Sequence, residues 1–450
     1  MTWINKKDSK KNSSLKRRYS LSLWINWLFL AMSALILAYT YYRAEVIFQG
    51  GKSTVYLKYY IVSLVSVFFW TGVLWLRDSV RANIVTTIIS LIVGIYMVEA
   101  GLIFSKSLNS HGNTIAKMGF EYDQRTALEV VDDLREDGVD AVLSVRPNSV
   151  LTIDKKLLPL GGISNKTTIA GNENGYHMIY LSDRYGFNNP DSEWDAAQVE
   201  WLLIGDSFAE GKAVSPGKDI AGQIRVITNT SSISLGKGGN GPLIELGTLT
   251  EYTEIIKPKK VLWLYFEGND LISDLQRGKA NPLLYQYMND GFSQGLIHRQ
   301  EEIDRKLKKF ITGKVKLSKT RWLRLQKIRG IMGFDVADRV DHVVIDPLFT
   351  QILTKAKART EALGGEFYFV YLPQYERYSE KNVSHGSYRK KSEVLELVKS
   401  LNIPIIDIHQ DVFVSHPDSL SLFPFRLNGH YNEVGYNEVA KAIVSNIKKQ

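Results

Sequence analysis

Three long apolar stretches dominate the first hundred residues of the chain. Residues 21–42, 59–76 and 84–104 are rich in Leu, Ile, Val and aromatic side chains, and only the third contains a charged residue. A helix needs about 20 such residues to cross the hydrocarbon core of a bilayer. The pattern predicts three transmembrane helices within residues 21–105, because a cleaved signal peptide has a shorter apolar core and no further spans behind it.

Basic residues are concentrated before the first apolar stretch. Residues 1–20 contain a run of Lys and Arg from Lys6 to Arg18. Short loops and tails on the cytoplasmic side of a membrane carry an excess of Lys and Arg. We therefore expect 1–20 to be a cytoplasmic tail. Three spans then place everything after residue 105 on the opposite side of the membrane.

Glu99 is the charged residue inside the third apolar stretch. An acid inside a membrane span can mark a functional site, whereas an acid about one turn from the interface needs no such role. The stretch ends soon after Glu99, at residue 104. We favour the second interpretation.

The rest of the chain predicts a lead-in segment followed by an α/β domain. In the lead-in, 106–197, residues 121–138 have the pattern of an amphipathic helix with a glycine stop. From 198 to 450, short apolar runs alternate with helical patterns, which is typical of a parallel sheet covered on both faces in three α/β/α layers. The expected strands are 201–204, 232–235, 261–266, 367–372 and 403–408, and the expected helices are 218–227, 243–256, 347–363, 388–401 and 433–448.

An insertion interrupts this alternation between residues 271 and 345. Basic and apolar residues are interleaved in its second half, around 305–329. This pattern is compatible with a lid, with a basic helix resting on an anionic membrane surface, and with a solvated helical excursion. The sequence does not choose among the three.

The amino-acid composition of the chain excludes several kinds of site. Cysteine is absent, so disulfides and thiolate metal sites are excluded. The formal net charge is +9, but the basic runs lack the zinc-ligand spacing and the aromatic pattern of nucleic-acid-binding modules. We therefore expect no nucleic-acid partner, and nothing in the sequence calls for a metal or a cofactor.

Four short motifs follow predicted strands or precede the last helix, and each also reads as an ordinary turn. They are Gly-Asp-Ser at 205–207, Leu-Gly-Lys-Gly-Gly-Asn-Gly-Pro at 235–242, Phe-Glu-Gly-Asn-Asp at 266–270 and Asn-Gly-His-Tyr-Asn at 428–432. Ligands of parallel sheets bind beyond the carboxyl ends of the strands, where Ser207 falls. Glycine N–H groups and the amide of Asn269 are suitable donors to an oxyanion, and His430 stands at the entry to a helix.

The order of these motifs resembles that of the SGNH, or GDSL-type, hydrolase superfamily. The resemblance covers about 199–450 and implies a flavodoxin-like three-layer fold. It further implies that Ser207 is the nucleophile and His430 the general base. Ser207, Gly239 and Asn269 would supply the oxyanion hole.

Two positions depart from the family pattern. Glu267 stands where the third motif usually has glycine, and Leu427 stands where the family has the acid that orients the histidine. Three aspartates are nearby in the sequence: Asp407, Asp411 and Asp418. We expect a Ser–His dyad whose imidazole is oriented by a main-chain group, with Asp411 and Asp418 as the alternatives.

The resemblance implies acyl transfer through a covalent acyl-serine. We expect a membrane-anchored esterase that acts on an acylated carbohydrate, on the outer side of a bacterial cytoplasmic membrane. Two alternatives stay open. One is an O-acyltransferase that modifies a polysaccharide and receives its acyl group from a partner protein. The other is a non-catalytic glycan-binding or assembly protein with the same fold, suggested by the missing acid.

Overall fold

The computed structural model describes residues 2–47, 53–108, 111–151, 156–318, 321–334, 345–379 and 387–449. The chain divides into two compact units, one made of residues 1–110 and 316–337 and the other of residues 111–315 and 338–450. Part of the predicted insertion 271–345 therefore belongs to the unit that holds the N-terminal helices. Residues 319–320 and 335–344 of that insertion lie outside the described residues.

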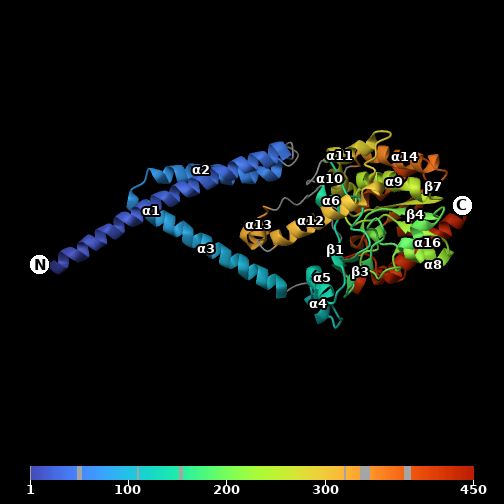
Figure 1. Ribbon diagram of the computed structural model, residues 1–450, viewed down its shortest axis with the longest axis horizontal. Helices are drawn as coiled ribbons and strands as arrows, with labels where there is room; N and C mark the ends of the chain where they lie inside the picture. Colours follow the sequence, from blue (N-terminus) through green and yellow to red (C-terminus); the bar gives the residue numbers. More distant parts are fainter. Residues whose placement is uncertain are drawn as a thin grey trace. The chain divides into compact units, whose positions relative to one another are not determined.

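Three long helices form the frame of the first unit (Figure 1): α1 (Thr2–Tyr41), α2 (Ser53–Leu74) and α3 (Asp78–Leu108). Each contains a segment long and apolar enough to cross a membrane, namely Arg17–Val46, Tyr56–Leu74 and Asp78–Phe104. The predicted tail runs into α1 as one continuous helix. Between the helices, Trp70, Val73 and Val85 form a small core, and the Asn26 amide donates to the Trp70 carbonyl at 3.1 Å.

A short segment from the second half of the chain packs against these helices. It comprises a turn, Arg321–Arg324, and helix α13 (Gln326–Ile331), which contacts α3. The Glu99 carboxylate accepts hydrogen bonds from the backbone N–H groups of Lys327 and Ile328, both at 2.9 Å. Glu99 is only 1% exposed. It therefore has a specific structural partner, which its place in the sequence did not indicate.

The second unit begins with a small mixed sheet. Its elements are α4 (His111–Lys117), α5 (Ala127–Glu136), β1 (Ala141–Leu143), α6 (Pro147–Val150), β2 (Thr167–Asn172) and β3 (His177–Leu181). Strand β2 pairs in parallel with β1 and antiparallel with β3. Thr126 begins α5 through a capping box with Glu129, which satisfies two backbone donors at the helix start. The predicted helix 121–138 is thus present in a shorter form.

A five-stranded parallel sheet forms the centre of the second unit. Its strands are β4 (Trp201–Ile204), β5 (Ser232–Ser234), β6 (Lys260–Phe266), β7 (Glu366–Leu372) and β8 (Ile405–Asp407). Their order in space is β5-β4-β6-β7-β8, with every pair parallel. This is the 2-1-3-4-5 order of flavodoxin-like folds. The fold class expected from the alternating pattern is confirmed.

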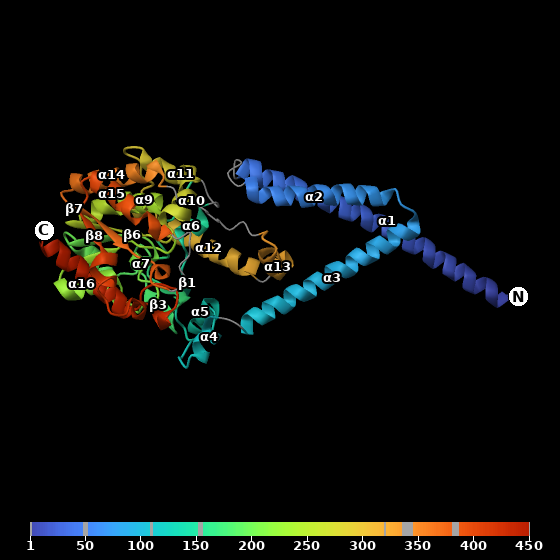
Figure 2. The same ribbon diagram turned by 180° about the vertical axis from the view of Figure 1, so that it is seen from behind.

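Helices cover both faces of this sheet, because side chains alternate between its faces along each strand. Leu202 and Ile204 of β4 face one core, and Trp201 and Leu203 face the other. In Figure 2, α9, α14 and α15 lie on one side of the strands and α16 on the other; α8 packs against α16. These helices are α8 (Ile220–Thr228), α9 (Pro242–Ile256), α14 (Pro347–Ala362), α15 (Lys391–Ser400) and α16 (Glu433–Lys449); α7 is Ser207–Glu210, and the insertion adds α10 (Leu275–Lys279), α11 (Pro282–Tyr285) and α12 (Gln300–Ser318).

The lead-in is joined to the edge of the parallel sheet by Asn189. The Asn189 amide accepts from the backbone N–H of Ser234 at 2.8 Å and donates to its carbonyl at 2.9 Å. Asn189 thus pairs with the edge strand β5 as a neighbouring strand would, and it satisfies backbone groups that an open sheet edge leaves exposed.

Candidate active site

Ser207 lies at the carboxyl end of β4, on the first residue of α7. The Asp206 side chain caps this helix by accepting the N–H of Phe208 at 2.9 Å. Gly205 makes the turn possible, since a side-chain carbon there would lie 3.0 Å from Cβ of Leu264 and 3.1 Å from Cβ of Ala209. The sharp turn therefore follows from the Gly-Asp-Ser sequence itself.

His430 approaches Ser207 from the loop before α16. Its Nε2 lies 2.7 Å from Ser207 Oγ, a normal hydrogen-bond distance. The imidazole packs against the ring of Phe208, with 4.6 Å between the ring centroids, and the His430 side chain is 15% exposed. The structure thus brings together the two residues that the motifs singled out, although they are 223 positions apart.

The other nitrogen of the imidazole contacts a carboxylate that the sequence analysis did not identify. Glu173 lies in the turn between β2 and β3, and its Oε2 is 2.7 Å from His430 Nδ1. The same oxygen accepts the backbone N–H of His430 at 3.0 Å. Glu173 Oε1 pairs with Lys212 Nζ at 3.1 Å. The expectation that a main-chain group orients His430 is wrong.

The environment keeps Glu173 ionised. Burial by itself raises the pKa of its carboxyl, but the contacts with His430 and Lys212 outweigh burial and hold that pKa well below its usual range. A carboxylate can only accept hydrogen bonds. A proton on His430 Nδ1 satisfies this acceptor, and in that tautomer Nε2 accepts a hydrogen bond from the Ser207 hydroxyl.

The three aspartates near the end of the chain are paired elsewhere. Asp411 accepts a hydrogen bond from the Asn446 amide at 3.1 Å. Asp418 pairs with Arg426, and Asp407 pairs with Lys391 at 2.5 Å. The structure thus gives the position beside Nδ1 to Glu173 rather than to Asp411 or Asp418.

Gly239 occupies a tight position opposite Ser207. Its φ of +75° is favourable mainly for glycine, and a side-chain carbon there would overlap the Asn148 amide of α6. Within the described part of the chain its backbone N–H has no hydrogen-bond acceptor. This N–H is therefore available to a ligand of the site.

Asn269 lies at the end of β6 and also borders the site. Its amide Nδ2 donates to Asp274 at 2.8 Å, and Asp274 is itself paired with Arg277 at 2.8 Å. A carboxamide nitrogen has two protons to donate. The contact with Asp274 fixes the orientation of the amide by using one of them.

A buried ion pair supports the loop that carries Gly239. Lys237 Nζ donates to Glu210 at 2.7 Å and to the Tyr180 hydroxyl of β3 at 2.9 Å. The second oxygen of Glu210 accepts the backbone N–H of Gly238 at 2.8 Å. Lys237 and Glu210 are 1% and 4% exposed. This network connects the lead-in sheet to the glycine loop.

Glu267, which replaces the usual glycine of the third motif, belongs to a separate buried network. Its carboxylate accepts the N–H of Gln374 at 2.8 Å and pairs with Arg377. It also accepts the Tyr371 hydroxyl. The negative charge of Glu267, which the family pattern does not have at this position, is therefore paired locally.

A cavity of about 340 Å³ opens over Ser207 and His430. Gly239 and Asn269 border it. Most of its other lining residues are polar or charged: Arg146, Asn148, Lys212, Asp274, Arg277, Gln374, Glu376 and Asn428. Among the described residues, no group of three or more His, Asp or Glu side chains is placed to hold a metal ion.

Glu173 was missed because nothing in its local sequence marks it. It stands in Gly-Asn-Glu-Asn-Gly, residues 171–175, which indicates a turn and no more. Its link to His430 spans 257 positions and exists only once the lead-in packs on the parallel sheet. The one available signal was an acidic residue at the tip of a turn, in a segment that has to pack against another part of the protein.

No protein-family model matches the chain, and no curated protein matches it. Solved structures of GDSL-type hydrolases are similar to it. A lipolytic protein of the G-D-S-L family from Veillonella parvula is 11% identical, over 56% of this chain and 100% of that one, with a TM-score of 0.32. A lipase/acylhydrolase from Enterococcus faecalis is 16% identical, over 56% and 96%, with a TM-score of 0.33. A putative acylhydrolase from Bacteroides fragilis is 11% identical, over 58% and 93%, with a TM-score of 0.32.

Proposed function

We propose that this protein is a serine esterase of the SGNH type that hydrolyses acyl esters through a covalent acyl-serine. The observation that carries the proposal is the chain of contacts from Ser207 Oγ to His430 Nε2 and from His430 Nδ1 to Glu173, each at 2.7 Å. This is the arrangement of a nucleophile, a base and an orienting acid. It opens into a cavity large enough for a small ester.

Each residue then has a defined role. Ser207 Oγ attacks the ester carbonyl while His430 Nε2 takes the hydroxyl proton, and His430 returns this proton to the departing alcohol. Glu173 holds the imidazole in the required tautomer and stabilises the imidazolium. Water then attacks the acyl-serine with His430 as base, which releases the acid and restores Ser207.

Three donors are suited to stabilise the oxyanion of the tetrahedral intermediates. They are the backbone N–H groups of Ser207 and Gly239 and the amide of Asn269. Donors held in place before the reaction stabilise developing charge without reorganisation. The φ of Gly239 and the contact of Asn269 with Asp274 provide that fixation.

The polar lining of the cavity supports a hydroxylated substrate such as an acylated carbohydrate. Arg146, Asn148 and Gln374 offer hydrogen-bonding groups beside Ser207. The same lining would admit a sugar hydroxyl as acyl acceptor, so an O-acyltransferase is the second candidate. We favour hydrolysis because three spans are too few to carry an acyl donor across a bilayer without a partner protein.

The proposed location is a bacterial cytoplasmic membrane, crossed by α1, α2 and α3, with the second unit on the outer side. The apolar segments of the three helices and the basic start of α1 support this topology. The non-catalytic alternative loses its main support, because it was suggested by the lack of an acid beside His430.

A fluorophosphonate probe tests the proposal directly. The full-length protein in detergent should be labelled on Ser207 and should hydrolyse an acetyl ester, and Ser207→Ala should lose both properties. Adding a sugar acceptor separates the two activities, since a transferase would form acylated sugar at the expense of free acid. A wild-type protein that is neither labelled nor active would overturn the proposal.

A further inference from the structure

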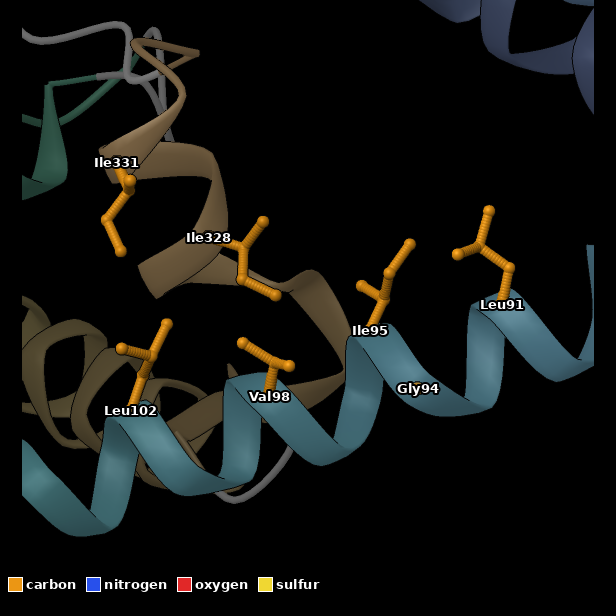
Figure 3. Close-up of a pocket in the computed structure, with 7 residues that line it drawn as sticks. All are labelled: Leu91, Gly94, Ile95, Val98, Leu102, Ile328 and Ile331. Carbon is orange, nitrogen blue, oxygen red and sulfur yellow. The ribbon is translucent and has the colours of Figure 1, made fainter.

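An apolar groove lies between α3 and α13 in the first unit. Its volume is about 470 Å³, within the range of roughly 300–1,000 Å³ typical of ligand pockets. Figure 3 shows Ile328 and Ile331 of α13 facing Val98 and Leu102 of α3. Every residue that lines the groove is aliphatic or glycine: Leu91, Gly94, Ile95, Val98, Leu102, Ile328 and Ile331.

The groove is held open by polar contacts at its sides. Glu99 binds the backbone N–H groups of Lys327 and Ile328, and the Tyr96 hydroxyl donates to the Leu323 carbonyl at 3.0 Å. On the other side of α13, the Arg329 guanidinium donates to the Tyr59 hydroxyl of α2 at 2.7 Å. Helix α13 is thus fastened to two membrane-span candidates while its isoleucines face the groove.

The groove has the length of one leaflet of a bilayer. Its α3 residues run from Leu91 to Leu102, 11 positions apart, which is about 16 Å of helix. This is roughly half of the 30 Å hydrocarbon core of a bilayer. Leu91 lies at the middle of the span candidate Asp78–Phe104, and Leu102 lies near its end. A chain in the groove would therefore run from mid-membrane to the surface.

Positive charge is concentrated at the segment that covers the groove. Arg324, Lys327 and Arg329 lie within six residues of one another, and Arg324 is exposed. Lys58 of α2 is a further cation close to this segment. It donates to the carbonyl of Gly333, two residues after the end of α13, at 3.2 Å. Glu99 adds a negative charge, but its two oxygens are bound to backbone N–H groups. An anionic headgroup is complementary to this surface.

We propose that this groove binds one acyl chain of an anionic phospholipid in the outer leaflet, with the phosphate against Arg324 and Lys327. The inference rests on the proposed membrane insertion of α3 and is independent of the reaction at Ser207. A bound lipid would fill the gap between α3 and α13. It would also stabilise the position of α13, whose first turn is hydrogen-bonded to Glu99.

The test uses full-length protein in nanodiscs that contain a trace of phosphatidylglycerol with a photoactivatable group on one acyl chain. Gly94→Leu fills the groove, since a side-chain carbon at Gly94 meets nothing within 4 Å. Gly101→Leu is the matched control, because Gly101 is on the same helix, is equally unobstructed and lies outside the groove. Phosphatidylcholine with the same photoactivatable chain tests whether an anionic headgroup contributes to binding.

We expect labelling on residues 91–102 and 326–331, reduced several-fold by Gly94→Leu and unchanged by Gly101→Leu. Phosphatidylglycerol should label more than phosphatidylcholine, by about fivefold for each cation that contacts the headgroup, and Arg324→Gln should narrow this difference. Equal labelling in both glycine variants, labelling spread evenly over α1–α3, or equal labelling by both lipids would overturn the proposal. A change in oligomeric state with Gly94→Leu would also overturn it, because the groove would then be covered by a second copy.

Discussion

The parallel-sheet domain and the lead-in both contribute to the candidate site, but they differ in what their sequences reveal. Ser207, Gly239, Asn269 and His430 stand in turns whose local sequence is distinctive, whereas Glu173 and Asn148 stand in segments without a motif. The first group depends on backbone geometry, which restricts nearby residue types. Glu173 contacts His430, and Asn148 borders the cavity, through side chains on a packed surface, which places few demands on their neighbours.

The largest expected effect concerns Ser207, the proposed nucleophile, on the motif side of this comparison. Ser207→Ala should lower ester hydrolysis by on the order of 10⁶-fold, and His430→Ala by a similar factor, because the two act as one unit. Turnover of an acetyl ester by the full-length protein measures both. Thermal unfolding serves as the folding control. A Ser207→Ala protein that kept most of its turnover would mean that the motif residues do not carry out the reaction.

The next effect tests the lead-in side. Glu173→Gln should lower turnover by about 10⁴-fold, since an amide can favour the wrong tautomer of His430. Asp411→Asn and Asp418→Asn are the matched controls and should each change turnover less than twofold, because these aspartates are paired elsewhere. A loss that followed Asp411 or Asp418 instead of Glu173 would mean that the lead-in only supports the fold.

A smaller effect is expected at Asn269, the proposed oxyanion donor on the motif side. Asn269→Ala should lower kcat by roughly 100- to 1,000-fold with little change in KM, as removal of one oxyanion donor does in known hydrolases. Steady-state kinetics separate the two constants. A rise in KM at constant kcat would instead identify Asn269 as a residue that binds the substrate in its ground state.

The smallest effect is on stability. The pKa of Glu173 is depressed in the folded protein, so its ionised carboxylate contributes stability fully above the unfolded value of about 4.3. That contribution is lost as the pH falls through the lower folded value. Wild type should therefore lose more Tm than Glu173→Gln between pH 7 and pH 3, by roughly 2–4 °C per kcal/mol of the contribution. Parallel loss in both proteins would contradict the depressed pKa.

The sequence was sufficient for the architecture because its signals there are local. Near-continuous apolar strands such as Leu202–Ile204 and the helices between them predict a covered parallel sheet without knowledge of distant contacts. The three membrane-span candidates follow in the same way from length and composition. The positions of Ser207 and His430 at one edge of the sheet follow from the topology.

The contacts that the sequence did not reveal are long-range. Glu173 meets His430 across 257 positions, and Glu99 meets Lys327 across 228. Both acids accept hydrogen bonds from backbone N–H groups, which every residue except proline offers. A backbone donor leaves no mark on the sequence of its segment, so neither pairing could be recognised before the segments were packed together.

The spacing of the three site residues has a consequence for biosynthesis. A chain is made from its N-terminus at about 5–20 residues per second, so Glu173 and Ser207 are made long before His430, which lies 223 positions after the serine. An unfinished chain thus carries a serine with no base beside it. Under the proposed mechanism the site is complete only when the loop before α16 has packed on the sheet, so the unfinished chain would have no esterase activity.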